Sequence, residues 1–424
     1  MLGLPELEIV RRDAIVPNLD ILFDPDCFVH LLSQSWPEAK DTKADITYVR
    51  YKAKKSCLVS YRLTSASGIH ELYAKAHPNG IELPSQPIEG RFILEKGAIV
   101  VSLFPEDKQL RVISELWNPK KRRGLLSTHL PEIDLSSVDL WVLNYLPERR
   151  FVCCMTDAHH RQMVIKAHDE KGMAAASVSN VHSAGRLRIG KKITESEENR
   201  FSIYEWLPGN LLSVEILLHD FNPQLLEMVG EALAEFHQQK ADVPFLKREE
   251  EKETLSSLTE HLAFLYPAMA ERLYSVSNEM SRTLHSLPDC SETIHGDFSA
   301  KQVLLNGETV GIIDLDRSAR GDSALDVGNF IAYLEREAVY GRFERERITT
   351  FRDTILRGYQ NIAPPPESKR IDFYVTLGLY RLLPDPFRYQ EKRWPQNMET
   401  ILRRIEQLSS RVRGNGAPLQ EVRK

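Results

Sequence analysis

The sequence predicts an α+β protein with two lobes, a small lobe of antiparallel strands and a larger helical lobe, behind an N-terminal α/β extension. Two segments of the first half repeat a hairpin followed by a third strand, an Asn-Gly pair marks another hairpin, and apolar residues at helical spacing fill much of the second half. A chain of 424 residues also exceeds the size at which one hydrophobic core usually stops growing. We therefore expect two or three subdomains.

The first half of the chain contains an internal repeat. Residues 49–59 and 142–153 both run from an apolar strand through a tyrosine and a basic turn into a second apolar strand. Each is followed by a strand that ends in Lys-Ala-His, at residues 75–77 and 166–168. We expect the N-terminal extension to repeat the hairpin of the small lobe. In the first copy, Lys75 is interpreted as an ordinary solvated strand lysine.

The clearest hairpin signal is the Asn-Gly pair at residues 306–307, which separates the apolar runs 303–305 and 309–313. Both central positions of a type I′ turn need positive φ, which Asn and Gly tolerate. A two-residue turn at this pair predicts that Leu305 pairs with Glu308.

This register brings oxygen-bearing side chains together. Gln302 falls opposite Gly311, and Asp314 returns to the end of the hairpin where Asp297 lies. Magnesium takes carboxylate and amide oxygens and keeps several waters, while a separate carboxylate can accept the proton of a hydroxyl group. Asp316 shares a strand face with Asp314 by the period of two, so it either assists a metal or is solvated.

The motif His295-Gly296-Asp297, with Gln302 five residues on and Ile-Ile-Asp-Leu-Asp at 312–316, resembles the signature of the aminoglycoside phosphotransferase and choline kinase family. The resemblance implies a bilobal protein-kinase-like fold, ATP and Mg²⁺ as cofactors, and phosphoryl transfer to a hydroxyl of a small molecule. The roles that it implies are catalytic base for Asp297, metal ligand for Gln302, Asp314 and, more weakly, Asp316, and structural support for His295 and Asp326.

Gln302 departs from the usual Asn of this signature by one methylene group. The maltokinase and glucosamine kinase branch resembles this chain in carrying Gln there, so a sugar or amino sugar joins aminoglycosides and amino alcohols as the implied acceptor. The alternative is a nucleotide-binding pseudokinase or regulatory module without turnover. Turnover with magnesium and ATP distinguishes the two.

The order of elements favours the second repeat for the nucleotide. It precedes an apolar strand that ends in Pro-Gly at 208–209 and resembles the hinge of this family, whose backbone near Glu205 and Leu207 would meet the adenine. Lys166 is then expected to meet the phosphates. Arg149 and Arg150 at the hairpin tip are expected to lie over them, because guanidinium groups suit phosphate oxygens.

A glutamate that would hold Lys166 is not evident near it in the sequence. Glu195 and Glu197 are more distant candidates, and the remaining possibility is that the lysine is held in another way. The acceptor is expected against the C-terminal helices, which we predict near 225–236, 326–334, 351–359 and 373–383. Candidate acceptor residues there are Tyr333, Glu335, Tyr380 and Arg388.

Composition excludes some partners. The net charge of −5 gives no electrostatic reason to bind nucleic acid or an anionic membrane, and the start of the sequence lacks the apolar stretch of a signal peptide. The five cysteines are scattered, and we interpret them as reduced, buried thiols of a cytoplasmic protein. The oligomeric state stays open.

We place the domain boundaries at 1–139 for a cap-like extension, 140–206 for the nucleotide-binding lobe, 207–412 for the catalytic lobe and 413–424 for a tail.

Overall fold

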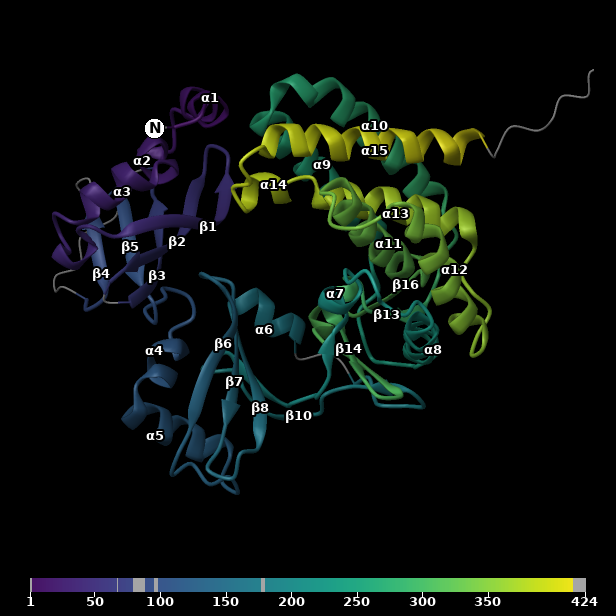
Figure 1. Cartoon of the computed structure of the whole chain (residues 1–424), viewed down its shortest axis with the longest axis horizontal. Coiled ribbons are helices and arrows are strands. Elements are labelled where there is room, and N and C mark those ends of the chain that lie inside the picture. The colour runs from purple at the N-terminus through teal and green to yellow at the C-terminus, as the bar shows by residue number, and fades with distance from the viewer. Residues whose placement is uncertain (1, 67, 79–87, 95–97, 177–179, 415–424) are drawn as a thin grey trace, which may run out of the picture.

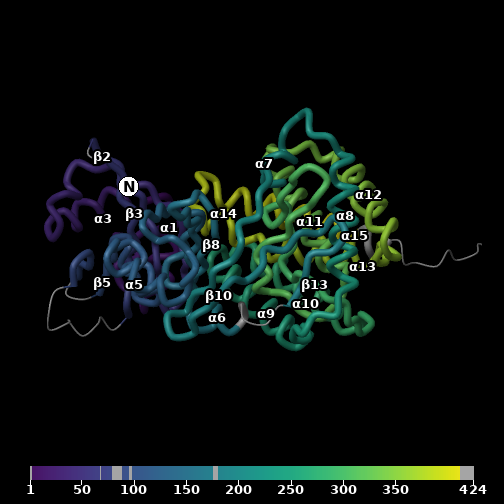
Figure 2. Tube along the Cα trace, turned by 90° about the horizontal axis from the view of Figure 1, so that it is seen from below, coloured from purple at the N-terminus to yellow at the C-terminus, as the bar shows by residue number. Residues whose placement is uncertain are grey.

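The computed structural model describes residues 2–66, 68–78, 88–94, 98–176 and 180–414. Two strand-rich units lie beside a lobe made mostly of helices (Figure 1). Figure 2, seen from below, also places both units, purple and blue, on the same side of the helical lobe. The predicted α+β class, with antiparallel sheets and many helices, is therefore confirmed.

The first unit, residues 4–103, is a five-stranded antiparallel sheet in the order β1-β2-β3-β5-β4, covered by three helices. Its core includes Phe28 stacked on Tyr61, with ring centroids 4.1 Å apart. The elements are α1 (Leu4–Arg12), α2 (Leu19–Phe23), α3 (Pro25–Leu32), β1 (Lys43–Lys52), β2 (Ser56–Ser65), β3 (Gly68–Ala76), β4 (Arg91–Leu94) and β5 (Ile99–Leu103).

The second unit, residues 104–205, has the sheet order β6-β7-β8-β11-β10. Both sheets thus place their first three strands in sequence and put the fifth strand between the third and the fourth, so the predicted repeat extends to whole sheets. The elements are α4 (Val112–Trp117), α5 (Pro119–His129), β6 (Asp139–Leu146), β7 (Arg150–Thr156), β8 (Gln162–His168), α6 (Glu170–Ala176), β10 (Lys192–Ser196) and β11 (Phe201–Glu205).

Helices α4 and α5 belong with the second sheet. Leu110, Ile113 and Leu126 share a buried cluster with Phe151 of β7, separate from the rest of the core. The predicted boundary between residues 139 and 140 would cut these helices from the sheet that they cover. We propose that the second unit begins near residue 104.

The helical lobe contains the hairpin of interest and the C-terminal helices, which lie near the predicted positions. Its elements are β12 (Asn210–Leu211), α7 (Leu212–Glu215), α8 (Leu225–His237), α9 (Arg248–Leu265), α10 (Ala270–Ser286), β13 (Glu292–Ile294), β14 (Val303–Asn306), β15 (Thr309–Ile312), β16 (Ala319–Gly321), α11 (Ala324–Val339), α12 (Glu346–Gln360), α13 (Ser368–Leu382), α14 (Asp385–Arg388) and α15 (Trp394–Gly414), joined by the short strand β9 (Leu187–Arg188). Beyond α15, residues 415–424 of the predicted tail lie outside the described residues.

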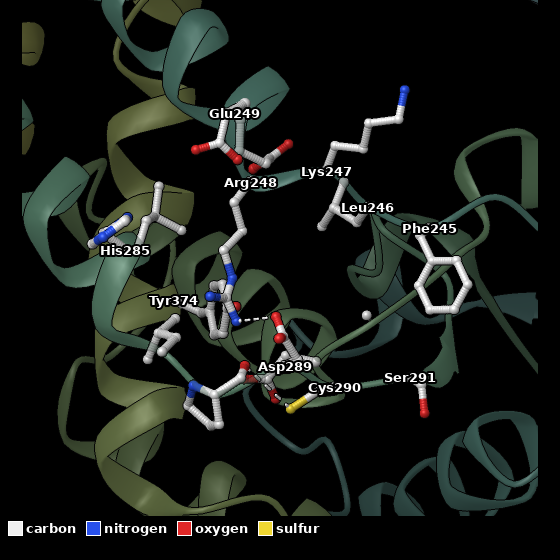
Figure 3. A pocket seen from close by; sticks show the side chains of 16 residues that line it. Phe245, Leu246, Lys247, Arg248, Glu249, His285, Asp289, Cys290, Ser291 and Tyr374 are labelled. Atoms are coloured by element: carbon white, nitrogen blue, oxygen red, sulfur yellow. Dashed lines mark hydrogen bonds and ion pairs between the residues drawn. The ribbon is translucent and has the colours of Figure 1, made fainter.

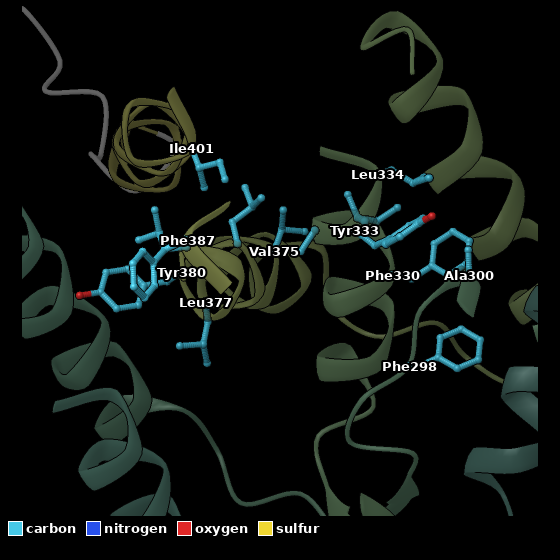
Figure 4. Packing of buried hydrophobic residues seen from close by; sticks show 14 of the residues in the cluster. Phe298, Ala300, Phe330, Tyr333, Leu334, Val375, Leu377, Tyr380, Phe387 and Ile401 are labelled. Atoms are coloured by element: carbon cyan, nitrogen blue, oxygen red, sulfur yellow. The ribbon is translucent and has the colours of Figure 1, made fainter. Parts of the chain in front are cut away.

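One hydrophobic core joins the first unit to the helical lobe. Phe387 of α14 packs against Phe23 and Tyr51 of the first unit, with centroid distances of 6.0 and 6.3 Å. Within the lobe, Figure 4 shows Phe298 beneath Phe330 of α11, and the two rings stack at 5.8 Å. This contact anchors the loop that follows β13 to α11, a helix in which most residues are buried.

The hairpin register differs from the predicted one. Asn306 pairs with Thr309, not Leu305 with Glu308, so the turn consists of Gly307 and Glu308. Only Gly307 of these two has positive φ, 56°, as in a turn that needs it at the first central position alone. Asn306 stays in the strand, and Leu304 takes the position opposite Gly311 that was predicted for Gln302.

The cysteines differ in their burial. Cys57, Cys153 and Cys154 are buried free thiols, but Cys27 is exposed and Cys290 is half-buried, so the expectation of five buried cysteines is wrong for those two.

Among the described residues, no helix is both long and apolar enough to cross a membrane.

Helices α8 and α12 cross at two glycines, and this contact can be tested. A β-carbon at Gly230 would overlap the carbonyl oxygen of Ile355. We expect Gly230→Ala to destabilise the protein by about 1–3 kcal/mol, because overpacking forces a closely packed backbone apart. The measurement is the denaturation midpoint followed by circular dichroism.

Gly124 provides the matched control. It lies within α5, is exposed, and has no atom within 4 Å of where a β-carbon would be. Gly124→Ala should raise stability by roughly 0.5–1 kcal/mol, since Ala is the better helix former. A Gly230→Ala midpoint equal to or above that of the unmodified protein would contradict the close approach.

Candidate active site

The loop that carries Asp297 is held by a buried carboxylate, Asp326 of α11. Asp326 accepts hydrogen bonds from the backbone N–H groups of His295 (2.6 Å) and Gly296 (2.9 Å), and its Oδ2 lies 3.0 Å from Nε2 of His237. The Asp326 side chain is fully buried. A buried carboxylate with three donors is a fixed support, because each donor compensates part of its lost hydration.

Gly296 meets a steric requirement of this loop. Its φ is 79°, and a β-carbon there would overlap the carbonyl oxygen of Arg317. A side chain is therefore excluded at this position both by conformation and by space. The Gly of the motif follows from the tight approach of the loop to the residues after β15.

His295 joins the Asp297 loop to the end of β15. Its Nδ1 accepts from the backbone N–H of Asp297 at 3.3 Å, and its Nε2 lies 3.0 Å from the carbonyl oxygen of Ile313. These two bonds fit the tautomer with the proton on Nε2. One imidazole ring thereby fixes the distance between Asp297 and the residue that follows Ile313, which is Asp314.

Asp297 faces the solvent while its surroundings are crowded. Its side chain is 58% exposed, and Nε of Arg317 lies 4.0 Å from its Oδ2. Burial within the site raises the pKa of the Asp297 carboxyl, and the charge of Asp314 acts in the same direction, against Arg317 and His295. A reachable carboxylate with a raised pKa is suited to accept a proton.

Asp314 lies between the two lobes. Arg150 of β7 donates from Nη1 to both carboxylate oxygens, at 2.8 and 2.7 Å, and Lys166 of β8 binds Oδ1 at 3.0 Å. Burial alone would raise the pKa of the Asp314 carboxyl, but the charges of Lys166 and Arg150 hold this pKa below its ordinary value. The backbone of Asp314 is left-handed, with φ of 68°, a conformation that a non-glycine residue keeps only when its neighbours impose it.

Asp316 joins the same cluster from a different backbone position than predicted. Lys166 Nζ lies 3.3 Å from its Oδ1, and Arg150 lies 3.9 Å from its Oδ2. The strand β15 ends at Ile312, and Asp316 lies in a short 3-10 turn. The predicted shared strand face of Asp314 and Asp316 is therefore wrong, although both carboxylates reach the same lysine.

Gln302 lies at the start of the hairpin. Its backbone oxygen accepts from the N–H of Ile313 at 3.0 Å, and its side-chain oxygen accepts from the hydroxyl of Ser299 at 2.6 Å. This places its backbone beside the residue preceding Asp314. Its amide oxygen keeps one lone pair for a further partner.

These oxygens can contribute to a magnesium site only together with a nucleotide. Within the described part of the chain, no three His, Cys, Asp or Glu side chains form a ready metal cluster. The carboxylates of Asp314 and Asp316 and the amide of Gln302 are the hard donors that magnesium prefers, and magnesium usually completes its shell with phosphate oxygens and water. The donor set therefore fits the implied ion.

The two predicted hinge residues lie where the chain passes between lobes. Glu205 ends β11 of the second sheet, and its backbone N–H donates to the oxygen of Lys191. Leu207 follows, and its side chain lies against Gly190 and Gly311. The next strand, β12, already pairs with β14 of the helical lobe. The N–H of Glu205 is thus occupied within the protein.

The lysine of each repeat has a different partner. Lys75 is not the solvated lysine that we expected, because its Nζ binds Glu148 at 2.6 Å and its side chain is only 21% exposed. Lys166 binds Asp314 and Asp316. Glu195 instead pairs with Lys192, so within the described residues Lys166 is held by aspartates of the helical lobe. Arg149 is exposed at the hairpin turn.

Two of the acceptor candidates are structural. Tyr380 is fully buried and shares a hydrogen bond with Thr259, and Glu335 is buried in a two-pronged ion pair with Arg404. Their predicted contact with an acceptor is therefore wrong. Tyr333 is buried but lies near the site, as Lys301 of the Asp297 loop has its Nζ 5.9 Å from the Tyr333 ring centroid. Arg388 lies 3.3 Å from Asp385.

A separate hollow of about 840 Å³ opens elsewhere on the helical lobe. Figure 3 shows Phe245, Arg248 and Asp289 around it. Its described lining includes neither Asp297 nor Asp314. We therefore assign it no part in the chemistry of the aspartate cluster.

The sequence did not reveal two residues that complete the support of the loop. His237 of α8 lies 3.0 Å from Asp326 and 2.9 Å from the hydroxyl of Tyr359 on α12. Both partners are distant in sequence. A buried histidine on an otherwise apolar helix face was the one available signal.

The support by Asp326 can be tested without an assay of activity. Asp326→Asn replaces one acceptor oxygen by an NH₂ group that faces N–H donors. We expect the loss to destabilise the protein by about 1–3 kcal/mol, the range for a buried polar group left unsatisfied. The measurement is the denaturation midpoint, with Asp353→Asn on the exposed side of α12 as the control. Equal midpoints for both variants would contradict the supporting role.

A comparison with known protein families matches the part of the chain that carries the Asp297 loop and the hairpin. Residues 173–373 match the model of the phosphotransferase enzyme family, APH. No curated protein matches the chain.

Solved structures with a similar fold include a GDP complex of an aminoglycoside 2′-phosphotransferase-IIIa mutant, with 17% identity, 71% of this chain and 100% of that chain covered and a TM-score of 0.47. A choline/ethanolamine kinase family protein from Mesorhizobium loti has 14% identity, 68% and 94% coverage and a TM-score of 0.48. An amicoumacin kinase bound to AMP-PNP, Ca²⁺ and its antibiotic has 14% identity, 70% and 95% coverage and a TM-score of 0.48. Residues 173–373, which carry Asp297 and Asp314, match this family model, in agreement with the family that the His295-Gly296-Asp297 motif predicted.

Proposed function

We propose that this protein is an ATP- and magnesium-dependent kinase that transfers the γ-phosphoryl group to a hydroxyl of a small molecule. The observation that carries the proposal is the arrangement of Asp297 and Asp314 on either side of His295, one carboxylate reachable from solvent and the other bound to Lys166 and Arg150. A base and a charged phosphate site are the two parts that phosphoryl transfer needs. A cytoplasmic location stays a prediction.

In the proposed mechanism, each side chain acts on a defined group. Asp297 accepts the proton of the acceptor hydroxyl as its oxygen bonds to the γ-phosphorus of ATP, while the bond from that phosphorus to the β–γ bridging oxygen breaks and ADP leaves with the electron pair. Lys166 and Arg150, which bind Asp314, supply positive charge to the phosphate oxygens. Asp314, Asp316 and Gln302 would hold magnesium, which when bound neutralises charge on the phosphates. His295 and Asp326 keep the loop of Asp297 in place.

The backbone near Glu205 and Leu207 is proposed to meet the adenine. The N–H of Glu205 already bonds to Lys191, so the contact would come from its carbonyl oxygen and from the backbone of Leu207. Arg149 extends from the turn next to Arg150 and would lie over the phosphates. These assignments follow the position of the residues between the second sheet and the helical lobe.

The charges near Asp297 favour an acceptor that is not a cation. Lys301 has no carboxylate at ion-pair distance among the described residues, and desolvation with the charge of Arg336 lowers its pKa, against the nearby acids Asp385, Glu337 and Asp297. Glu337 and Asp385, the acidic side chains on this side, already bind Arg336 at 2.8 Å each. A polycation would therefore meet the positive charge of Lys301, and the one carboxylate left for it there would be that of the base, Asp297. We propose a neutral, hydroxyl-rich acceptor such as a sugar.

The alternative is a nucleotide-binding module without turnover. Two observations favour it, since both occupy candidate metal ligands: Gln302 accepts a hydrogen bond from Ser299, and Nη1 of Arg150 donates to both carboxylate oxygens of Asp314. ATP binding with no phosphoryl transfer to any acceptor would support this alternative.

The base role of Asp297 predicts a large and specific loss. Asp297→Asn should lower kcat by about 10²- to 10⁴-fold, the usual contribution of a positioned base, with the denaturation midpoint unchanged or raised because the side chain is exposed and its charge is not paired closely. The measurement is ATP-dependent turnover beside thermal unfolding. Asp353→Asn again serves as the control and should retain full activity.

The pH dependence gives a second reading of the same base. The raised pKa of Asp297 means that the active carboxylate form is lost as pH falls through a value above the ordinary 3.9 or so of aspartate. Removing Arg317, which lowers this pKa, should move the acid limb of kcat/KM to higher pH. A limb that stays in place in Arg317→Met would remove Asp297 from the base role.

The acceptor class can be tested by ATP consumption over neutral sugars, amino sugars, aminoglycosides and amino alcohols. We expect turnover with neutral sugars and little with polycations. Lys301→Glu should raise kcat/KM several-fold for an amino sugar relative to its neutral counterpart, because it replaces a cation near Asp297 by an anion. Lys369→Glu, exposed on α13, makes the same charge change as a control. Aminoglycosides as the best acceptors of the unmodified protein would overturn this proposal.

A further inference from the structure

The two N-terminal units repeat a specific hydrogen-bonded device as well as a sheet. In the first unit, Asp13 accepts from the hydroxyl of Tyr51 at 2.6 Å and from the backbone N–H of Lys54 at 2.7 Å. Lys54 occupies the β1–β2 turn with φ of 59°. An aspartate before the sheet thus fixes the turn of the first hairpin.

The second unit contains the same set of hydrogen bonds, with each of the three residues 94 positions later in the sequence. Asp107 accepts from the hydroxyl of Tyr145 at 2.9 Å and from the backbone N–H of Glu148 at 2.8 Å, and Glu148 has φ of 58° in the β6–β7 turn. Each aspartate also accepts from the N–H groups two and three residues after it. Lys54 and Glu148 are therefore equivalent positions.

The lysines of the third strands are equivalent as well. Lys75 lies in β3 between β2 and β5, and Lys166 lies in β8 between β7 and β11. Lys166 faces the aspartates of the helical lobe. Lys75 instead has its ion-pair partner in the β6–β7 turn of the second unit.

That partner is Glu148, whose side chain is only 5% exposed. Lys75 Nζ lies 2.6 Å from Glu148 Oε2, Arg50 Nη2 lies 3.1 Å from the same oxygen, and Arg50 Nη1 donates to the carbonyl oxygen of Pro147 at 3.0 Å. The turn is thus held by Asp107 through its backbone and by the first unit through its side chain. A carboxylate this buried requires such partners.

The turn carries the residues proposed to meet the phosphates. Arg149 and Arg150 follow Glu148 directly, and Arg150 reaches Asp314. A turn held from both sides leaves little freedom for the two arginines. Without the first unit, the left-handed Glu148 would lose its ion pairs with Lys75 and Arg50 and keep the hydrogen bond that its backbone N–H donates to Asp107.

We propose that Lys75 and Arg50 are positioning residues for the nucleotide: the first unit, a repeat of the small lobe, uses its lysine to bind Glu148 and so sets Arg149 and Arg150 over the phosphates. The inference rests on the proposed function, because it assumes that this turn covers a nucleotide. It gives the first unit a role beyond packing. In this proposal, Lys75 does not contact the nucleotide itself and acts on it through the β6–β7 turn of the second unit.

The experiment combines hydrogen exchange with nucleotide binding on the full chain. In Lys75→Met, the amides of residues 148–150 should exchange faster, and the affinity for AMP-PNP with Mg²⁺ should fall about tenfold, as part of the loss of a charged hydrogen bond is transmitted to Arg149 and Arg150. Glu148→Gln, nearly isosteric, should give the same two changes if Lys75→Met folds poorly. The exchanged pair Lys75→Glu with Glu148→Lys should recover at least part of both.

Arg62→Met is the matched control. Arg62 forms a 2.6 Å ion pair with Glu71 on the same sheet, but both side chains are exposed, so its loss should change neither quantity. A lower denaturation midpoint in Lys75→Met with unchanged nucleotide affinity and unchanged exchange would show that the contact only joins the units, and would overturn the inference. If the unmodified protein binds no nucleotide while the exchange of the amides of residues 148–150 still responds to Lys75→Met, the proposed function fails and the hold on the turn stands.

Discussion

The ion cluster around Asp314 connects the parts of this protein. Arg150 comes from the hairpin of the second unit, Lys166 from the strand beside it, and Asp314 from the end of the hairpin in the helical lobe. Two cations and two carboxylates are brought from separate segments into one partly buried place, where each would be unfavourable alone. The orientation of the second unit against the helical lobe is therefore fixed by the same charges that a phosphate would use.

A second chain of contacts leads away from that cluster to the first unit. Arg150 follows the turn at Glu148, which binds Lys75 and Arg50, and the first unit packs on α14 through Phe387. The three parts thus form a closed path in which the first unit contacts both others. Displacing the first unit would affect the core of the helical lobe and the turn over the site together.

The sequence allowed prediction of features that lie within short segments. Asp297 and Asp314 belong to one loop and hairpin, so motif and period were enough to place them near each other. The predicted register was off by two residues, because Gly307 alone takes the positive φ and Asn306 remains in the strand. That choice depends on the fit of the hairpin to its neighbours, which local propensity does not contain.

Contacts between distant segments could not be predicted, and they decide what each repeated lysine does. Lys75 and Lys166 have the same local sequence and the same place in equivalent sheets, yet one binds Glu148 and the other Asp314. The difference comes from what lies opposite each sheet. A repeated sheet reproduces its lysine but not the helical lobe that supplies a carboxylate, so the first unit needs an acid from elsewhere, and the turn position equivalent to its own Lys54 provides it in the second unit as Glu148. The change of charge at that one turn position is what allows one copy to bind the other.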